Sequence, residues 1–161
     1  MLLRRYWDLQ PANVVLSITG GALDFVLSPM LRTAFSHGLA KAAHASSALV
    51  VTGGTNSGVM RLTGRSLEEF DAHVQCLGIC SWGAINARSQ LSGVQDLDKV
   101  VPIERTAPNS KNGVNIEPNH THFLLVDNQK ELGRDKDKVY AAIHPPTSLP
   151  HPSLFTLTRA R

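Results

Sequence analysis

Four short runs of apolar residues alternate along this chain with segments in which apolar side chains recur every three or four positions. The runs cover residues 13–19, 48–51, 74–82 and 121–127. The first run is nearly continuous, as is typical of a strand that is buried on both faces. Helical spacing follows Ser28-Pro29, a favourable helix start, and continues to about His44. A second helix is expected from Asn56 or Ser57, either of which can cap it, to Phe70.

The order strand, helix, strand, helix, strand predicts an α/β fold with a mainly parallel sheet and right-handed crossovers. One face of the first helix is expected to pack on this sheet. Its apolar positions are Leu31, Ala34, Phe35, Leu39, Ala42 and Ala43. Residues 83–117 are rich in Gly, Asn, Ser and Asp, and only Val100 to Ile103 resembles a short strand. We expect a long excursion there, at the ligand-facing edge of the sheet.

The last part of the chain has a different composition. It is charged after Gly133 and then rich in proline, so an irregular or extended tail is expected. The chain is therefore divided into a domain at residues 7–133 and a tail at residues 134–161.

Composition excludes several classes of protein. The chain has 161 residues, of which 42% are hydrophobic and 18% are charged, and this fits one globular domain. The net charge of +3 comes without a block of Lys or Arg, which argues against nucleic acid as a partner. No apolar run approaches the ~20 residues that cross a bilayer, and no signal peptide is evident, which favours a cytosolic location. Cys76 and Cys80 are expected to be buried free thiols.

Two Thr-Gly-Gly sequences end apolar runs and carry the strongest indication of function. Thr19-Gly20-Gly21 ends the first run, and Thr52-Gly53-Gly54 ends the second and leads into the second helix. Glycine lets a backbone approach a ligand closely, and the first N–H groups of a helix attract an anion. Since parallel strands share one carboxyl edge, both turns predict a nucleotide or phosphate site at a switch in strand order. The candidate residues are Gly20, Gly21, Thr52, Gly53, Gly54, Thr55, Asn56, Ser57 and Gly58.

The alternative is that both turns are tight connections with packing glycines and no ligand. The second turn matches neither the P-loop nor the dinucleotide fingerprint, because the required Lys and glycine spacing are missing. The helix that follows also lacks an acidic residue in its first turn.

Five other residues have both a functional and a structural interpretation. Trp82 can stack on a base or pack in the core, and Arg88 can reach a phosphate or remain solvated. His120 and His122 share one face of a strand, but no further metal ligand is evident. Asp127 can bind a ribose hydroxyl or cap a turn. No nucleophile lies beside a base in the sequence, so no catalytic residue is expected.

Taken in order, five sequence blocks resemble one family. They are residues 17–25, residues 35–41 (FSHGLAK), residues 51–60 (VTGGTNSGVM), residues 77–79 with 82–83, and residues 117–127 (EPNHTHFLLVD). From about Trp7 to Asp127 they resemble the cytosolic N-terminal homology region of melastatin-type transient receptor potential (TRPM) cation channels. This region is the eukaryotic member of the SLOG, or LSDAT, group of Rossmann-like domains.

The resemblance implies a Rossmann-like three-layer sandwich and a regulatory role in a calcium-permeable channel, without enzymatic activity. It implies that residues 52–58 contact a nucleotide such as ADP-ribose, and less directly that Gly20 and Gly21 do. Other subunits of a tetrameric channel are the implied partners, and no cofactor is required. The family's domain continues beyond the fourth strand, so this chain is expected to be truncated in its C-terminal part.

Two alternatives to nucleotide sensing remain open. The first is a ligand-free structural or assembly module of the same channel. The second is a nucleotide phosphoribohydrolase of the LOG type, from the wider group. Those enzymes carry a Pro-Gly-Gly-x-Gly-Thr turn beside a catalytic glutamate, and this chain contains no Pro-Gly-Gly sequence.

Overall fold

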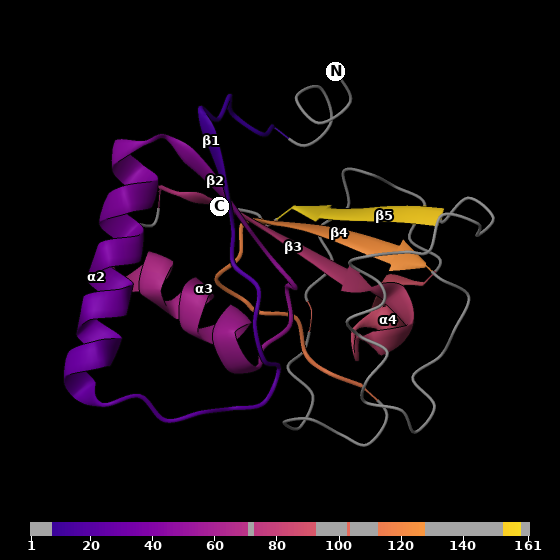
Figure 1. Ribbon diagram of the computed structural model, residues 1–161. Coiled ribbons are helices and arrows are strands. Elements are labelled where there is room, and N and C mark those ends of the chain that lie inside the picture. The colour runs from indigo at the N-terminus through magenta and orange to yellow at the C-terminus, as the bar shows by residue number, and fades with distance from the viewer. Residues whose placement is uncertain (1–7, 71–72, 93–102, 104–112, 128–152, 159–161) are drawn as a thin grey trace.

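A computed structural model describes residues 8–70, 73–92, 103, 113–127 and 153–158, which form one five-stranded sheet with helices (Figure 1). The strands follow the order β1-β2-β3-β4-β5 across the sheet. They are β1 (Val14–Ser17), β2 (Ala48–Thr52), β3 (Gln75–Ser81), β4 (His122–Asp127) and β5 (Ser153–Thr158). The first four strands run parallel, and β5 runs antiparallel to β4. The expected α/β fold with a mainly parallel sheet is confirmed.

Two long helices connect the first three strands. Helix α2 (Pro29–Ala45) follows β1, and α3 (Gly58–Phe70) follows β2. The predicted start of α2 is confirmed, because the Ser28 hydroxyl accepts the Leu31 N–H at 3.3 Å. Two short helices follow β3, namely η1 (Trp82–Ala84) and α4 (Arg88–Leu91). Figure 1 shows α2 and α3 beside one end of the sheet and α4 near the end of β3.

The core lies on one face of the sheet. Val50 pairs with Cys76 in register, and both are buried against residues of α2 and α3. Cys80 is four positions further along β3, so it projects from the same face as Cys76. It is buried with Phe123 and Leu125 against the segment that contains η1 and α4. The described helices therefore share one face of the sheet and cover different halves of it.

Three details differ from the sequence-based expectations. Strand β1 is not buried on both faces: Val14 is 42% exposed and Val15 is 62% exposed, because β1 is an edge strand. The tail was expected to be irregular or extended; residues 153–158 are extended and, beyond that expectation, pair with β4 along six residue pairs. The described strands follow their order in the sequence, so no switch in strand order lies between β1 and β2. Val100 to Pro102 and most of the tail lie outside the described residues.

The packing face of α2 also differs. Its buried residues are Ser36, Ala40 and Ala43, whereas Leu31 is 55% exposed. The reason is that α2 packs on α3 as well as on β2, and small residues allow a close approach. The Ser36 and Ser66 hydroxyls share a buried hydrogen bond of 2.7 Å between these two helices. The apolar spacing predicted the helix correctly, but it predicted the buried face only in part.

Candidate functional site

The two Thr-Gly-Gly turns meet at the start of α3. Strand β1 pairs with β2 up to Ser17, and the Ile18 N–H then donates to the Val51 carbonyl at 2.8 Å. The chain continues to Gly21, whose carbonyl accepts the Val59 N–H of α3 at 3.2 Å. The expected meeting of the two turns is therefore observed. The contact joins the first turn directly to the first residues of the helix.

Two glycines of the second turn have backbone conformations that favour glycine. Gly54 has a φ of +70° and Gly58 a φ of +49°. A Cβ at Gly54 would lie 2.8 Å from the Gly78 Cα, and a Cβ at Gly58 would collide with the Gly21 carbonyl oxygen. The packing of the turn itself therefore requires both glycines. Gly54 packs against β3, and Gly58 packs against the first turn.

An acidic side chain from the β1–α2 loop caps α3. The Gly58 N–H donates to the Asp24 carboxylate at 3.0 Å, and Arg61 forms an ion pair of 2.6 Å with the same oxygen. This pairing supplies the negative charge that the first turn of α3 lacks in its own sequence. The Gly58 N–H, followed by Arg61, lowers the pKa of Asp24. The Asp24 side chain remains 48% exposed to solvent, and the Arg61 side chain is 30% exposed.

The predicted side-chain cap by Asn56 or Ser57 is not observed. The Ser57 hydroxyl lies 3.1 Å from the Thr55 hydroxyl, and the Asn56 amide oxygen has no hydrogen-bond partner within the described part of the chain. The Asn56 N–H donates to the Asn115 carbonyl at 2.7 Å. Beside it, Thr55 forms an antiparallel bridge with Ile116. Residues 115–117 therefore pack along the turn and use much of its hydrogen-bonding capacity.

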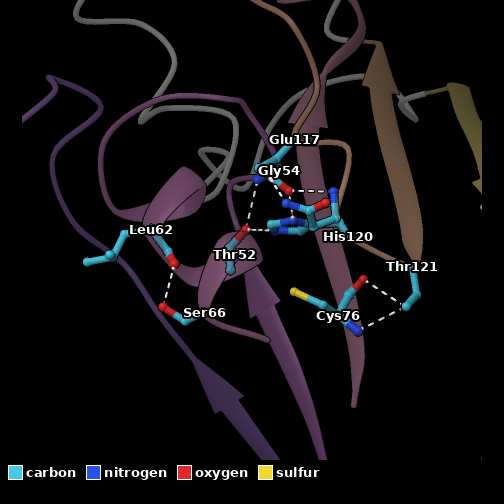
Figure 2. A network of polar contacts seen from close by, with 9 residues as sticks. Thr52, Gly54, Leu62, Ser66, Cys76, Glu117, His120 and Thr121 are labelled. Carbon is cyan, nitrogen blue, oxygen red and sulfur yellow. Dashed lines mark hydrogen bonds and ion pairs between the residues drawn. The ribbon is translucent and has the colours of Figure 1, made fainter. Parts of the chain in front are cut away.

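Beneath the turn, a buried network links Thr52, His120 and Glu117 (Figure 2). The Thr52 hydroxyl accepts the Gly54 N–H at 2.9 Å and lies 2.6 Å from His120 Nε2. His120 Nδ1 lies 3.2 Å from the Glu117 carboxylate. Both ring nitrogens of His120 therefore have a polar partner, the Thr52 hydroxyl on one side and the Glu117 carboxylate on the other.

The Glu117 carboxylate is held from several directions. It accepts the Asn119 N–H at 2.6 Å, and the Glu117 N–H donates to the Gly54 carbonyl at 2.9 Å. Its carboxylate also packs against Gly64 of α3, where any Cβ would collide with it. The charge of Glu117 acts on Cys76: burial, and secondly this carboxylate, raise the pKa of the thiol. Burial alone raises the pKa of Cys80 to about 12.

The order hydroxyl, imidazole, carboxylate is also that of a hydrolase triad. Access decides against this chemistry, because His120 is 0% exposed, Glu117 is 1% exposed and Thr52 is 4% exposed. A substrate does not reach the hydroxyl in this arrangement. The network instead fixes the end of β2 against the segment before β4.

The other candidate residues lie apart from the α3 start. Trp82 packs on the cluster of Cys80, Phe123 and Leu125, and Arg88 begins α4. His122 Nδ1 is 2.8 Å from the Thr121 hydroxyl. No group of three possible metal ligands exists among the residues that the structure describes. Within the same residues, no helix has the length and apolar character needed to cross a membrane.

The sequence-based site omitted Asp24 and Glu117. Both belong to the sequence blocks that carry the family resemblance, but neither was assigned a role. The missing acid in the first turn of α3 was a signal that a distant residue supplies the negative charge, and Asp24 does so. The i, i+3 spacing of Glu117 and His120 was a signal for a side-chain pair.

Comparison with known proteins identifies a family and several relatives of this chain. The eukaryotic LSDAT family model, described as SLOG in TRPM, matches residues 1–137. Transient receptor potential cation channel subfamily M member-like 2 of Nematostella vectensis is 38% identical over 136 residues, or 81% of this chain and 9% of the relative. Subfamily M member 2 of Mus musculus is 31% identical over 135 residues, or 78% of this chain and 9% of the relative.

A third relative has a similar degree of identity. Subfamily M member 7 of Homo sapiens is 35% identical over 131 residues, which is 78% of this chain and 7% of the relative. The chain thus spans less than a tenth of the length of these curated relatives. The glycine turns, Asp24 and the Glu117–His120 pair all lie within the family match.

Proposed function

This chain belongs to the SLOG family found in TRPM cation channels, and we propose that it is the ligand-sensing module of such a channel. Its ligand is a nucleotide such as ADP-ribose, bound at the carboxyl edge of β1 and β2. Its partners are other subunits of the channel, and it works on the cytosolic side of the membrane.

One observation carries the ligand part of the proposal: the start of α3 already binds an anionic group. The Asp24 carboxylate accepts from the Gly58 N–H and pairs with Arg61. A phosphate oxygen uses the same donors, since it is also an anionic acceptor that fits a helix N-terminus and an arginine. Both side chains of the pair are partly exposed, so a ligand can approach them.

Burial divides the candidate residues into two groups. Gly20 and Gly21 are exposed, and Gly53 and Asn56 are half-buried, so these four residues are the ones that a nucleotide would contact. Thr52, Gly54, Thr55, Ser57 and Gly58 are buried. In the proposal Thr52, Gly54, Thr55 and Ser57 support the turn from below, and Gly58 contributes its backbone N–H to the anion.

Thermal unfolding tests this proposal. We expect millimolar ADP-ribose to raise the midpoint of the chain, with AMP as the control nucleotide. A ligand at a hundredfold excess over its Kd stabilises the native state by about 2.7 kcal/mol. Arg61→Gln should abolish the shift, whereas Arg32→Gln, a matched change at an exposed position of α2, should keep it. Equal midpoints with and without ADP-ribose would reject the nucleotide part of the proposal.

A ligand-free assembly module is the second candidate, and the internal hydrogen bonding favours it. Asp24 occupies the start of α3, and Thr52, Thr55 and Ser57 are bonded within the protein. This candidate predicts self-association of the purified chain with no effect of nucleotides.

Release of a free base from AMP would instead support the phosphoribohydrolase alternative.

A further inference from the structure

The loop between β1 and α2 has two sides of different character. On one side, the Gly21 carbonyl and the Asp24 carboxylate contact the first residues of α3. On the other side, Leu23 is 81% exposed and Val26 is 99% exposed. Further exposed apolar side chains follow at Phe25, Met30 and Leu31. We call residues 23–31 the apolar segment.

Three contacts tie this loop to α3 within a few residues. The Gly58 N–H donates to Asp24 at 3.0 Å, the Val59 N–H donates to Gly21 at 3.2 Å, and Arg61 pairs with Asp24 at 2.6 Å. The first turn also packs directly, because a Cβ at Gly20 would lie 3.2 Å from a methyl group of Val59. Asp24 is the negatively charged member of this group, and it accepts from both the Gly58 N–H and Arg61.

We infer that Asp24 is a releasable clasp that couples the start of α3 to the position of the apolar segment. When the clasp is closed, the loop is held on α3 and the apolar segment has one position. When another anion takes the Gly58 N–H and Arg61, Asp24 leaves and the loop is freed. The release of Asp24 by another anion rests on the proposed function. The holding of the loop on α3 by Asp24 is a property of the chain alone.

The accessibility of the clasp allows it to open. The Asp24 side chain is 48% exposed and the Arg61 side chain 30%, so solvent ions reach the pair without unfolding of the core. A diphosphate carries more negative charge and more acceptor oxygens than one carboxylate, and it competes well for an arginine and a helix N–H. The buried network of Thr52, His120 and Glu117 holds the second turn in place meanwhile.

Amide exchange and limited proteolysis of the full 161-residue chain test the clasp without any ligand. We expect Asp24→Ala to speed exchange at the Gly58 and Val59 amides about tenfold, and to speed chymotryptic cleavage after Phe25 similarly. Asp24→Asn keeps an acceptor for Gly58 but loses the ion pair, so its effect should be smaller. Glu69→Gln removes one negative charge at the exposed far end of α3 and should change neither rate.

A thermal unfolding midpoint close to that of the wild type will show that each variant is folded. If Asp24→Ala then leaves both rates unchanged, the clasp is overturned. Arg61→Gln provides an independent check, because it removes a partner of Asp24 and keeps the Gly58 acceptor. It should speed the Phe25 cleavage, and an unchanged rate would also contradict the clasp.

The release of Asp24 by an anionic ligand is tested separately, by cleavage after Phe25 and by the affinity for ADP-ribose. ADP-ribose and inorganic pyrophosphate should speed cleavage after Phe25 in the wild type, and ADP-ribose should bind Asp24→Asn about tenfold more tightly. Binding of ADP-ribose with no change in cleavage and no gain in Asp24→Asn would overturn the coupling and leave the proposed function standing. If ADP-ribose binds to neither protein, the proposed function fails, and the Asp24→Ala rates alone decide whether the clasp exists.

Discussion

The Thr52 hydroxyl and His120 Nε2 lie 2.6 Å apart, although the two residues are 68 positions apart in the sequence. This contact joins the end of β2 to the segment that enters β4. Because Thr52 also accepts the Gly54 N–H, the same hydroxyl sets the conformation of the glycine turn. The shape of the candidate ligand edge thus depends on a buried pair beneath it.

Replacing His120 should destabilise the chain strongly. His120→Ala leaves the Glu117 carboxylate and the Thr52 hydroxyl buried without their shared partner, and we expect a loss of about 3 kcal/mol. Urea unfolding measures this loss. Lys41→Ala, at an exposed position of α2 outside the network, serves as the control and should cost less than about 0.5 kcal/mol. Equal midpoints for the two variants would contradict the structural role of the network.

Two glycine-to-alanine changes should have opposite effects. At Gly54 the φ of +70° and the contact with Gly78 disfavour any side chain, so Gly54→Ala should cost about 2 kcal/mol or more. Gly38 lies inside α2 with open space around it, so Gly38→Ala should stabilise the chain by about 0.5–1 kcal/mol. Thermal unfolding of both variants tests the pair. A stabilising effect at Gly54 would show that the turn is not as described.

The contribution of Asp24 should depend on pH. The Gly58 N–H and Arg61 lower the pKa of Asp24 from 3.8, so the folded state binds a proton less readily than the unfolded chain does. The resulting stabilisation is present above pH 3.8 and is lost as the pH falls through the lower folded pKa. Asp24→Asn should therefore be less stable than the wild type at pH 7, and this difference should shrink toward pH 3. A difference that grows on acidification would be inconsistent with this pairing.

The two cysteines should be unreactive in the native chain. Burial raises the pKa of Cys80 to about 12, and burial with the nearby Glu117 charge raises that of Cys76 as well. Because the thiolate is the reactive form, a thiol reagent at pH 8 should label both residues only after unfolding in urea. Fast labelling of the folded chain would show that β3 is more open than described.

The sequence predicted the helices and strands better than it predicted their burial and their pairing. Continuous apolar runs identified the four parallel strands, and Ser28-Pro29 identified the start of α2, because these signals are local. The exposure of Val15 was not predictable, since it depends on the position of β1 at the sheet edge. Strand β5 was also missed, because the pairing of Ser153–Thr158 with β4 depends on a partner far away in the sequence.

In the candidate site, too, the local features were predicted from the sequence and the long-range contacts were not. The glycine turns were found from their own residues, and their meeting followed from the parallel order of the strands. The cap of α3 was assigned to neighbouring side chains, whereas the structure uses Asp24, which lies 34 positions before Gly58. Local patterns cannot identify a contact of that kind. The burial of His120 was likewise invisible in its spacing from His122.

Backbone amide chemical shifts report directly on the proposed binding of a nucleotide's anionic group at the start of α3. The chain would be titrated with ADP-ribose while the backbone N–H signals are followed by NMR. We expect the largest changes at Gly21, Gly58 and Val59, with saturation and with loss of the effect in Arg61→Gln. Absence of any change at Gly58 and Val59 at millimolar ADP-ribose would contradict the claim.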